Sequence, residues 1–151
     1  MYPDPDVAAF ITNTFVPVRA HVREQADEFK RLGQRFDAQW TPTTLIIDPA
    51  EAAERHRIEG FLPKDEFLAQ LMLGLGHSAF GRGKFAEARE WFDQVLGKYP
   101  DTEAAPEAQY WTGVAQYKES GDGAALAATG KRFAERYGDT VWAKKASVWL
   151  R

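Results

Sequence analysis

Side chains able to do nucleophilic or metal chemistry are scarce in this sequence. None of its 151 residues is cysteine, which removes disulfides, thiolate nucleophiles and zinc–thiolate sites. The three histidines, His21, His56 and His77, are far apart along the chain. Their separation argues against a metal site, and we interpret them as solvated side chains. No Ser-His-Asp arrangement and no His-Glu-x-x-His motif is present.

The other candidate stretches have structural explanations. Acidic pairs such as Asp65-Glu66 suit the positive end of a helix better than general acid–base work. Gly81-Arg82-Gly83-Lys84 is too short to cradle a phosphate, and a turn between two helices explains both glycines. The sequence therefore predicts no catalytic residue, no cofactor and no metal, and a protein that is not an enzyme.

The composition is that of an ordinary globular protein. The net charge is −3 and neither half carries a basic stripe, so we expect no nucleic-acid partner. No apolar run approaches the roughly 18–20 residues that a membrane helix needs, so we expect no membrane partner. The stretch Met1–Asp6 is acidic and proline-rich, unlike the start of a secretory signal, which favours a cytoplasmic location.

The spacing of apolar residues predicts an αβαββ order over the first 62 residues. One helix begins at Pro5-Asp6 and a second covers 24–36. Residues 15–23, FVPVRAHVR, alternate apolar and polar side chains, which predicts a half-buried strand. The run Thr43–Asp48 predicts a strand covered on both faces, and Arg55–Phe61 predicts a charged edge strand. We therefore expect a compact sheet of three strands.

Beyond Leu62 only helices are predicted, and the sequence repeats itself. Residues 101–111 align with residues 139–149 through identical Asp, Thr, Ala, Ala and Trp residues at a constant offset of 38. A period of this length is typical of stacked helical hairpins. The last copy is one helix long, which predicts a cap in which Trp142 and Trp149 cover the end of the stack. The expected helices are 64–82, 84–98, 104–119, 122–136 and 141–150.

The repeated half resembles the tetratricopeptide repeats, with a generic helical bundle as the alternative. In the second copy Gly113 and Gly121 fit that family, but the large aromatic residue is shifted to Phe133. Gly83 stands at the turn between the first pair of helices. The first copy has the family's packing positions at Leu75, Gly76, Ala88, Phe92 and Pro100.

This resemblance implies a concave face, made by the first helix of each pair, that binds a protein or peptide. Aromatic rings and cationic side chains are suitable for such contacts. On this face we expect a partner to contact His77, Tyr110, Tyr117 and Lys118.

The first half resembles the C-terminal two-thirds of a thioredoxin-fold domain. Residues 2–75 follow its order of helix, strand, helix, Trp40-Thr41-Pro42-Thr43, two strands and a helix. They look especially like bacterial thioredoxin-like proteins that carry helical repeats after this domain. The resemblance implies that Thr41-Pro42 occupies the family's cis-proline position. The family's Cys-x-x-Cys segment and central strand would lie before Met1, so no catalytic residue can be carried over. Thiol–disulfide exchange needs a thiolate, and none is present.

The combined interpretation is an α+β N-terminal half, incompletely thioredoxin-like, that continues into an all-α helical-hairpin repeat. The predicted limits are 1–75 for the first module and 64–151 for the repeats, which share a helix over 64–82. Without the central strand, two apolar strands lack a neighbour for their backbone groups. We therefore expect either that the strands pair with each other or that a homodimer forms through the strand carrying Val16, Val18 and Val22.

Two functions from different classes remain open at this point. The first is a non-catalytic protein-interaction or scaffold protein with a redox-inactive thioredoxin-like module. The alternative is the C-terminal portion of a thiol–disulfide oxidoreductase whose Cys-x-x-Cys segment is missing from this chain. A longer native product with an upstream Cys-x-x-Cys would favour the alternative.

Overall fold

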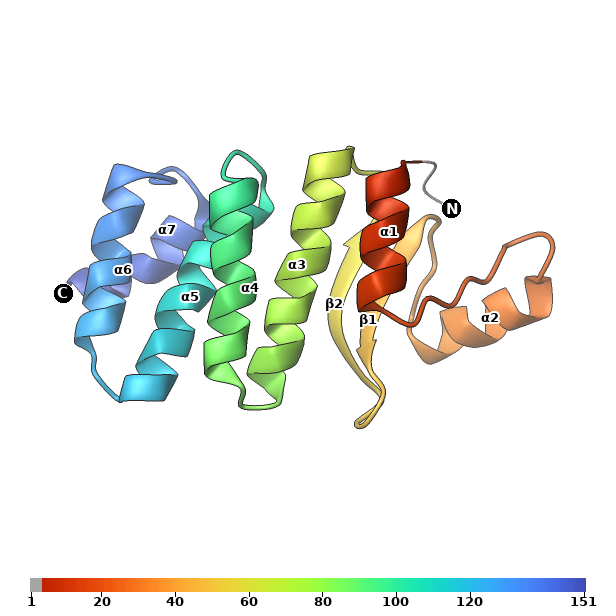
Figure 1. Cartoon of the computed structure of the whole chain (residues 1–151), viewed down its shortest axis with the longest axis horizontal. Helices are drawn as coiled ribbons and strands as arrows, with labels where there is room; N and C mark the ends of the chain where they lie inside the picture. Colours follow the sequence, from red (N-terminus) through yellow and green to blue (C-terminus); the bar gives the residue numbers. More distant parts are fainter. Residues whose placement is uncertain (1–3) are drawn as a thin grey trace. The chain divides into compact units, whose positions relative to one another are not determined.

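The computed structural model describes residues 4–151 of the chain. The tripeptide Met1-Tyr2-Pro3, which opens the predicted N-terminal module, lies outside the described residues. Two compact units are formed: one by the residues up to Thr44 together with Ile58–Lys64, and one by Leu45–Arg57 together with Asp65–Arg151. The elements are α1 (Pro5–Thr14), α2 (Ala26–Arg35), β1 (Thr43–Asp48), β2 (Ala53–Glu59), α3 (Lys64–Gly81), α4 (Phe85–Lys98), α5 (Ala104–Ser120), α6 (Ala124–Glu135), α7 (Val141–Ala146) and the 3₁₀ helix η1 (Ser147–Leu150) (Figure 1).

Helix α1 of the first unit begins with a well-formed cap. The carboxylate of Asp4 accepts hydrogen bonds from the backbone N–H groups of Asp6 and Val7 at 2.9 and 3.2 Å, which satisfies two free donors at the helix start. Lys64 lies 3.1 Å from Asp4 and also pairs with Asp6, and both contacts favour the charged form of the lysine. Val7 is 1% exposed and belongs to the protein core.

The predicted strand at 15–23 does not form, and the prediction of three strands is wrong. Among the described residues the sheet has only two strands, β1 and β2, which pair antiparallel. Val16 and Val18 are 93% and 81% exposed, so the apolar face of the alternating pattern is bare. A strand needs a hydrogen-bonded neighbour, and Pro17 also lacks a backbone N–H. The alternation therefore produces an extended segment that ends in a turn before α2.

The two strands of the hairpin lie close to the predicted positions. β1 has the expected bounds, whereas β2 begins and ends two residues before the predicted edge strand. The Thr41–Pro42 peptide bond is cis, the isomer that the resemblance to thioredoxin implied. The N–H of Gly60 donates to the carbonyl of Pro42 at 2.8 Å, which extends the backbone pairing beyond the start of β1.

Five helical segments of the second unit, α3 to α7, are found within two residues of the predicted bounds, with η1 as the tail of the last one. In Figure 1 these helices follow one another as packed neighbours from green to blue. Gly76 of α3 faces the ring of Phe92 in α4, and 37 residues later Gly113 of α5 faces Thr129 in α6. Each glycine therefore lets the second helix of a pair approach the first closely. Gly83, at a φ of 75°, forms the turn between α3 and α4.

The turns that precede α5 and α7 repeat each other in detail. Thr102 Oγ donates to the carbonyl of Tyr99 at 2.7 Å, and Thr140 Oγ donates to the carbonyl of Tyr137 at 2.7 Å. The second turn is tied to the first, because Tyr137 Oη donates to the carbonyl of Pro100 at 2.6 Å. The offset of 38 in the sequence is therefore also an offset in local structure.

Candidate functional site

A continuous series of ring contacts crosses the second unit from the hairpin to the C-terminal helices. We call it the aromatic ladder and define it by five residues of β2, α3, α5 and η1. Neighbouring ring centroids in it are 4.7 to 5.7 Å apart. This spacing is that of favourable aromatic pairs, which contribute about 0.5–1.5 kcal/mol beyond their buried area. In order, the ladder runs through His56, His77, Trp111, Tyr110 and Trp149.

The histidines of the ladder are held by hydrogen bonds to polar side chains. His56 Nε2 donates to Gln70 Oε1 at 2.7 Å, and His77 Nε2 donates to Glu107 Oε1 at 2.9 Å. Burial lowers the pKa of His56 below its ordinary value, because desolvation penalises the imidazolium. The interpretation of both histidines as separate, solvated side chains is wrong, since their rings stack 5.7 Å apart.

One carboxylate, Glu107, lies beside this pair of histidines. Within residues 4–151 no group of three or more histidine or carboxylate side chains could hold a metal ion. The ladder therefore offers ring faces and single hydrogen-bonding groups. Such an arrangement is suitable for packing or for binding a partner.

Trp111 stands at the centre of the ladder. Its ring contacts His77 and Tyr110 edge-on, and Phe80 lies 5.2 Å away on the same side of α3 and α5. The indole N–H of Trp111 is buried and finds no acceptor among the described residues. A buried donor without a partner costs about 1–3 kcal/mol. The packing around Trp111 therefore leaves its indole N–H unsatisfied.

The predicted partner-binding residues divide into two groups. His77 and Tyr110 are half-buried members of the ladder, and the rings of Trp142 and Trp149 pack on Tyr110 at 5.2 and 4.7 Å. Tyr117 is 37% exposed and Lys118 is exposed, and both lie further along α5, at its C-terminal end. The structure brings His77 close to Tyr110 through Trp111, and it leaves Tyr117 and Lys118 open to solvent.

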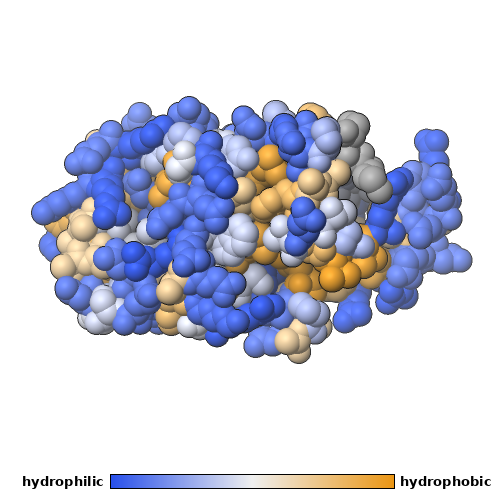
Figure 2. Space-filling model, viewed as in Figure 1, coloured by the Kyte–Doolittle hydropathy of each residue, from blue (hydrophilic) through white to orange (hydrophobic). Residues whose placement is uncertain are grey.

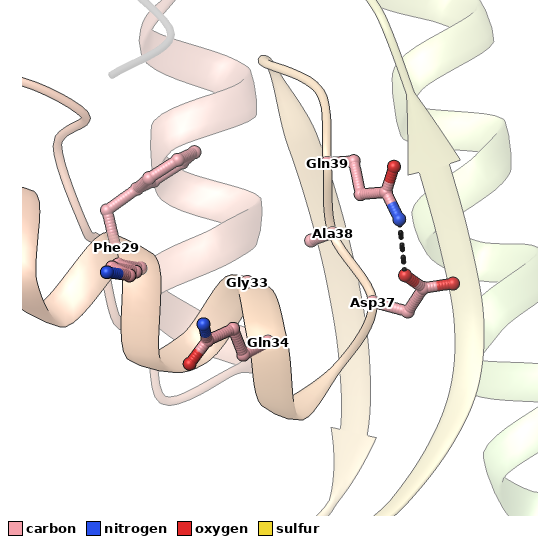
Figure 3. A pocket seen from close by; sticks show the side chains of 7 residues that line it. Phe29, Gly33, Gln34, Asp37, Ala38 and Gln39 are labelled. Atoms are coloured by element: carbon pink, nitrogen blue, oxygen red, sulfur yellow. Dashed lines mark hydrogen bonds between the residues drawn. The ribbon is translucent and has the colours of Figure 1, made fainter.

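The family proline position lies in the first unit. Thr41 and Pro42 are exposed, and the neighbouring Trp40 is 68% exposed. With no cysteine in the chain, this loop has no thiol beside which it could act. A shallow, open hollow is lined by other residues of that unit, at the end of α2 and in the loop that follows it (Figure 3). Gln39 donates to Asp37 at 2.8 Å there, and we assign the hollow no chemistry.

A buried carboxylate, Asp48, fixes the end of β1 within the second unit. Arg82 Nε donates to it at 2.8 Å, and Arg55 lies 3.5 Å away on the same oxygen. The hydrogen bond from Arg82 lowers the pKa of Asp48 to about 2. The guanidinium of Arg55 also lies against Gly81, where an added Cβ would meet it at 2.5 Å. This network ties the hairpin end to the last turn of α3.

The sequence did not predict that His56, Trp111 and Trp149 belong to one series of ring contacts, the aromatic ladder. Their contacts depend on helix packing, which brings positions 56, 77, 111 and 149 together. The available signal was the repeat itself, because Trp111 and Trp149 are equivalent at the offset of 38.

Comparison with known families identifies the class of the first half. Residues 1–73 match the family of thioredoxin-like domains. The N-terminal part is therefore a thioredoxin-like domain, and it lacks cysteine, so a Cys-x-x-Cys redox site is absent from this chain. Neither the curated proteins nor the solved structures gave a match. Within residues 4–151, no helix combines the length and the apolar character that crossing a bilayer requires.

Proposed function

We propose that this chain is a non-catalytic protein-interaction module. The observation that carries this proposal is the aromatic ladder, which runs from β2 across α3 and α5 to η1, while Tyr117 further along α5 is exposed. Partly buried rings offer large contact area at low entropic cost, and aromatic residues are enriched at interfaces. The absence of cysteine supports a binding role for the adjoining thioredoxin-like domain, since thiol exchange needs a thiolate.

The helical region is proposed to work as a tetratricopeptide-like stack. The paired contacts of Gly76 with Phe92 and of Gly113 with Thr129 support this interpretation, as do the matching turns before α5 and α7. In such a stack the first helix of each pair, here α3, α5 and α7, forms the face that binds an extended peptide. The ladder and Lys118 then supply ring contacts and one cation for a peptide carboxylate.

The test compares two surface variants for binding to a partner recovered by crosslinking and then purified. Tyr117→Ala/Lys118→Ala removes the exposed part of the proposed face, and the loss of about 1–2 kcal/mol expected for an interface aromatic weakens binding about five- to thirtyfold. Glu90→Ala/Lys98→Ala on α4 is the matched control and is expected to leave the Kd unchanged. Equal affinity of all three proteins would refute this face as the binding site.

We also propose that the exposed apolar side chains of the first unit form contacts with a second copy of the chain. Val16, Val18, Trp40 and Phe61 are 68% to 93% exposed. Large apolar side chains exposed to this degree favour contact with another protein surface. Static light scattering at micromolar concentration is expected to give the mass of a dimer, and Val16→Ser/Val18→Ser is expected to give a monomer. A wild-type protein that is monomeric across that range would contradict the dimer.

The alternative function is that of the C-terminal portion of a thioredoxin-like oxidoreductase. The match of residues 1–73 to the thioredoxin-like family supports it. The native protein decides between the two, because intact mass spectrometry reveals any additional N-terminal segment and a dithiol reductase assay reveals its activity. A native mass equal to that of the 151 residues leaves only the binding function.

A further inference from the structure

The hairpin is attached to α3 at two separate points. At the end of β1, Asp48 accepts a hydrogen bond from Arg82, the residue that follows α3, and we call this contact the Asp48 anchor. Earlier along α3, Gly74 lies against the hairpin, where an added Cβ would clash with Ile46 and would meet the Cβ of His56 at 2.9 Å. The eight residues from Gly74 to Arg82 span about 12 Å of helix. The two points are therefore far enough apart to be disturbed separately.

The second point is held by two stacked imidazole rings that share one carboxylate. His77 Nε2 donates to Glu107 of α5 at 2.9 Å, whereas His56 Nε2 donates to the neutral amide oxygen of Gln70 at 2.7 Å. The ring centroids of the two histidines are 5.7 Å apart. Glu107 compensates a proton on His77, but a proton on His56 then lies beside a second positive ring and has no carboxylate of its own. We call this stacked pair with Gln70 the His56 latch.

The other carboxylates of the two strands near His56 are already paired. On the same strand, Glu54 accepts two hydrogen bonds from Arg57, each at 2.8 Å. In β1, the hydrogen bond from Arg82 lowers the pKa of Asp48 to about 2. Asp48 therefore stays ionised over the whole range in which histidine titrates, and the Asp48 anchor is unaffected there. Only the His56 latch changes its charge in mildly acidic solution.

The surroundings of His56 disfavour its charged form. Burial lowers the pKa of His56 most, and the neighbouring His77 lowers it further. The hydrogen bond to Gln70 and the carboxylates of Glu107 and Glu54 raise it by less. Above 6.5, the ordinary pKa of histidine, His56 is neutral whether the latch is closed or open, so closure is complete there. Below that value the open form takes up a proton more readily than the closed form, so falling pH favours opening.

We propose that the His56 latch is a proton-sensitive device that releases the middle of the hairpin from α3 in mildly acidic solution, while the Asp48 anchor still holds the end of β1. A second proton on the stacked pair is repelled by the first, and His56 relieves this repulsion by leaving His77. Release bares the ring face of His77 and the side chain of Ile46, which is 6% exposed when the latch is closed.

Opening at this place changes the character of the surface. Figure 2 shows apolar residues gathered in the region where Figure 1 draws the hairpin, and mostly hydrophilic residues over α4 to α6. Release therefore adds a ring face and an aliphatic side chain to an area that is already apolar. The aromatic ladder loses its first ring, and His77 becomes its open end. The device needs no partner, so it goes beyond the proposed function and stands or fails independently of it.

The backbone of the hairpin reports its release. Two strands alone are marginally stable in water, and the sheet of the described residues consists of β1 and β2 only. The experiment is hydrogen–deuterium exchange of the full chain at pH 7 and pH 5, measured on peptides covering 43–59 and corrected for the intrinsic pH dependence of exchange. Hairpin opening is expected to increase about fivefold or more at pH 5, because one proton changes an equilibrium by up to about tenfold per pH unit. The protection of α6 is expected to stay unchanged.

Three variants locate the effect, and each is judged by its own ratio of opening at pH 5 to opening at pH 7. His56→Gln can still donate to Gln70 but does not titrate, so its ratio is expected to be close to one. His77→Gln removes the second ring and is expected to reduce the ratio without abolishing it. The matched control is His21→Gln, which removes the histidine that lies outside the latch and is expected to keep the wild-type ratio.

Two results for the wild-type protein would overturn the proposal. One is a ratio close to one, and the other is an equal loss of protection in the hairpin and in α6, which would indicate global unfolding. An undiminished ratio in His56→Gln would also overturn it. If that variant does not fold, His77→Gln decides, because an undiminished ratio there shows that the stacked pair is not the source of the pH dependence.

Discussion

Gly76 is the position where one methyl group tests the packing of the helical pairs most directly. In Gly76→Ala the new Cβ would lie 2.2, 2.6 and 2.8 Å from three ring carbons of Phe92, which is fully buried. Since an ordinary carbon–carbon contact is about 3.5 Å, the ring has to move by roughly 1.3 Å. The ring centroids of His77 and Phe92 are 5.5 Å apart, so a shift of the Phe92 ring also disturbs the aromatic ladder at His77.

Two opposing terms set the size of the effect. Alanine stabilises a helix interior by about 1 kcal/mol relative to glycine. Overpacking of a fully buried ring costs about 1–3 kcal/mol, and the short distances at Phe92 place this site near the upper end. The net loss is therefore about 2 kcal/mol. For a protein of this size that corresponds to a decrease of about 4–8 °C in Tm.

The assay is thermal and urea unfolding followed by circular dichroism, with Gly97→Ala as the matched control. Gly97 lies in α4 with nothing within 4 Å of its added Cβ, so the same substitution there keeps only the helix term. Its Tm is expected to rise by about 2 °C. If Gly76→Ala is as stable as Gly97→Ala, the close approach of α3 and α4 is not what glycine provides.

Three further outcomes follow from named contacts. The ionised Asp48, with its pKa lowered to about 2, stabilises the fold fully above about pH 3.8, and this stabilisation is lost as the pH falls towards about 2. Asp48→Asn cannot form the ion pair with Arg82. In that variant the free energy of unfolding should therefore depend less on pH between about 3.8 and 2, as acid unfolding would measure. Burial lowers the pKa of His56, so the free energy of unfolding should fall as the pH drops below 6.5, the ordinary pKa of histidine. An NMR titration that gives His56 a pKa at or above 6.5 would contradict this. Tyr137→Phe removes the hydrogen bond to Pro100 and should cost about 1 kcal/mol in urea unfolding, whereas an unchanged midpoint would show that solvent replaces it.

The helices could be predicted from the sequence because their signal is local. Apolar spacing, Gly83 at a turn and the repeated turn residues all act within one or two helical turns, and the predicted bounds agree within two residues. The alternation at 15–23 is also local, but a strand exists only when a neighbour accepts its hydrogen bonds. Val16 and Val18 stand exposed because that neighbour is not found among the described residues.

The candidate site could be predicted only in part. His77 and Tyr110 were placed on the first helices of their pairs by the repeat, and Trp149 was predicted to cover the end of the stack. The stack of His56 on His77 needs the hairpin to approach α3, and this depends on Gly74. An added Cβ there would meet Ile46 at 2.2 Å and the Cβ of His56 at 2.9 Å. A glycine in a predicted helix indicates close approach, but not which segment approaches.

The hairpin closes one end of the helical region in the second unit. At one end the hairpin residues Ile46 and His56 cover Gly74, and Ile46 is 6% exposed, so that end is sealed. A hairpin derived from a thioredoxin-like domain thus serves as packing for the helices and needs no thiol for that role. Binding is accordingly expected along the ladder.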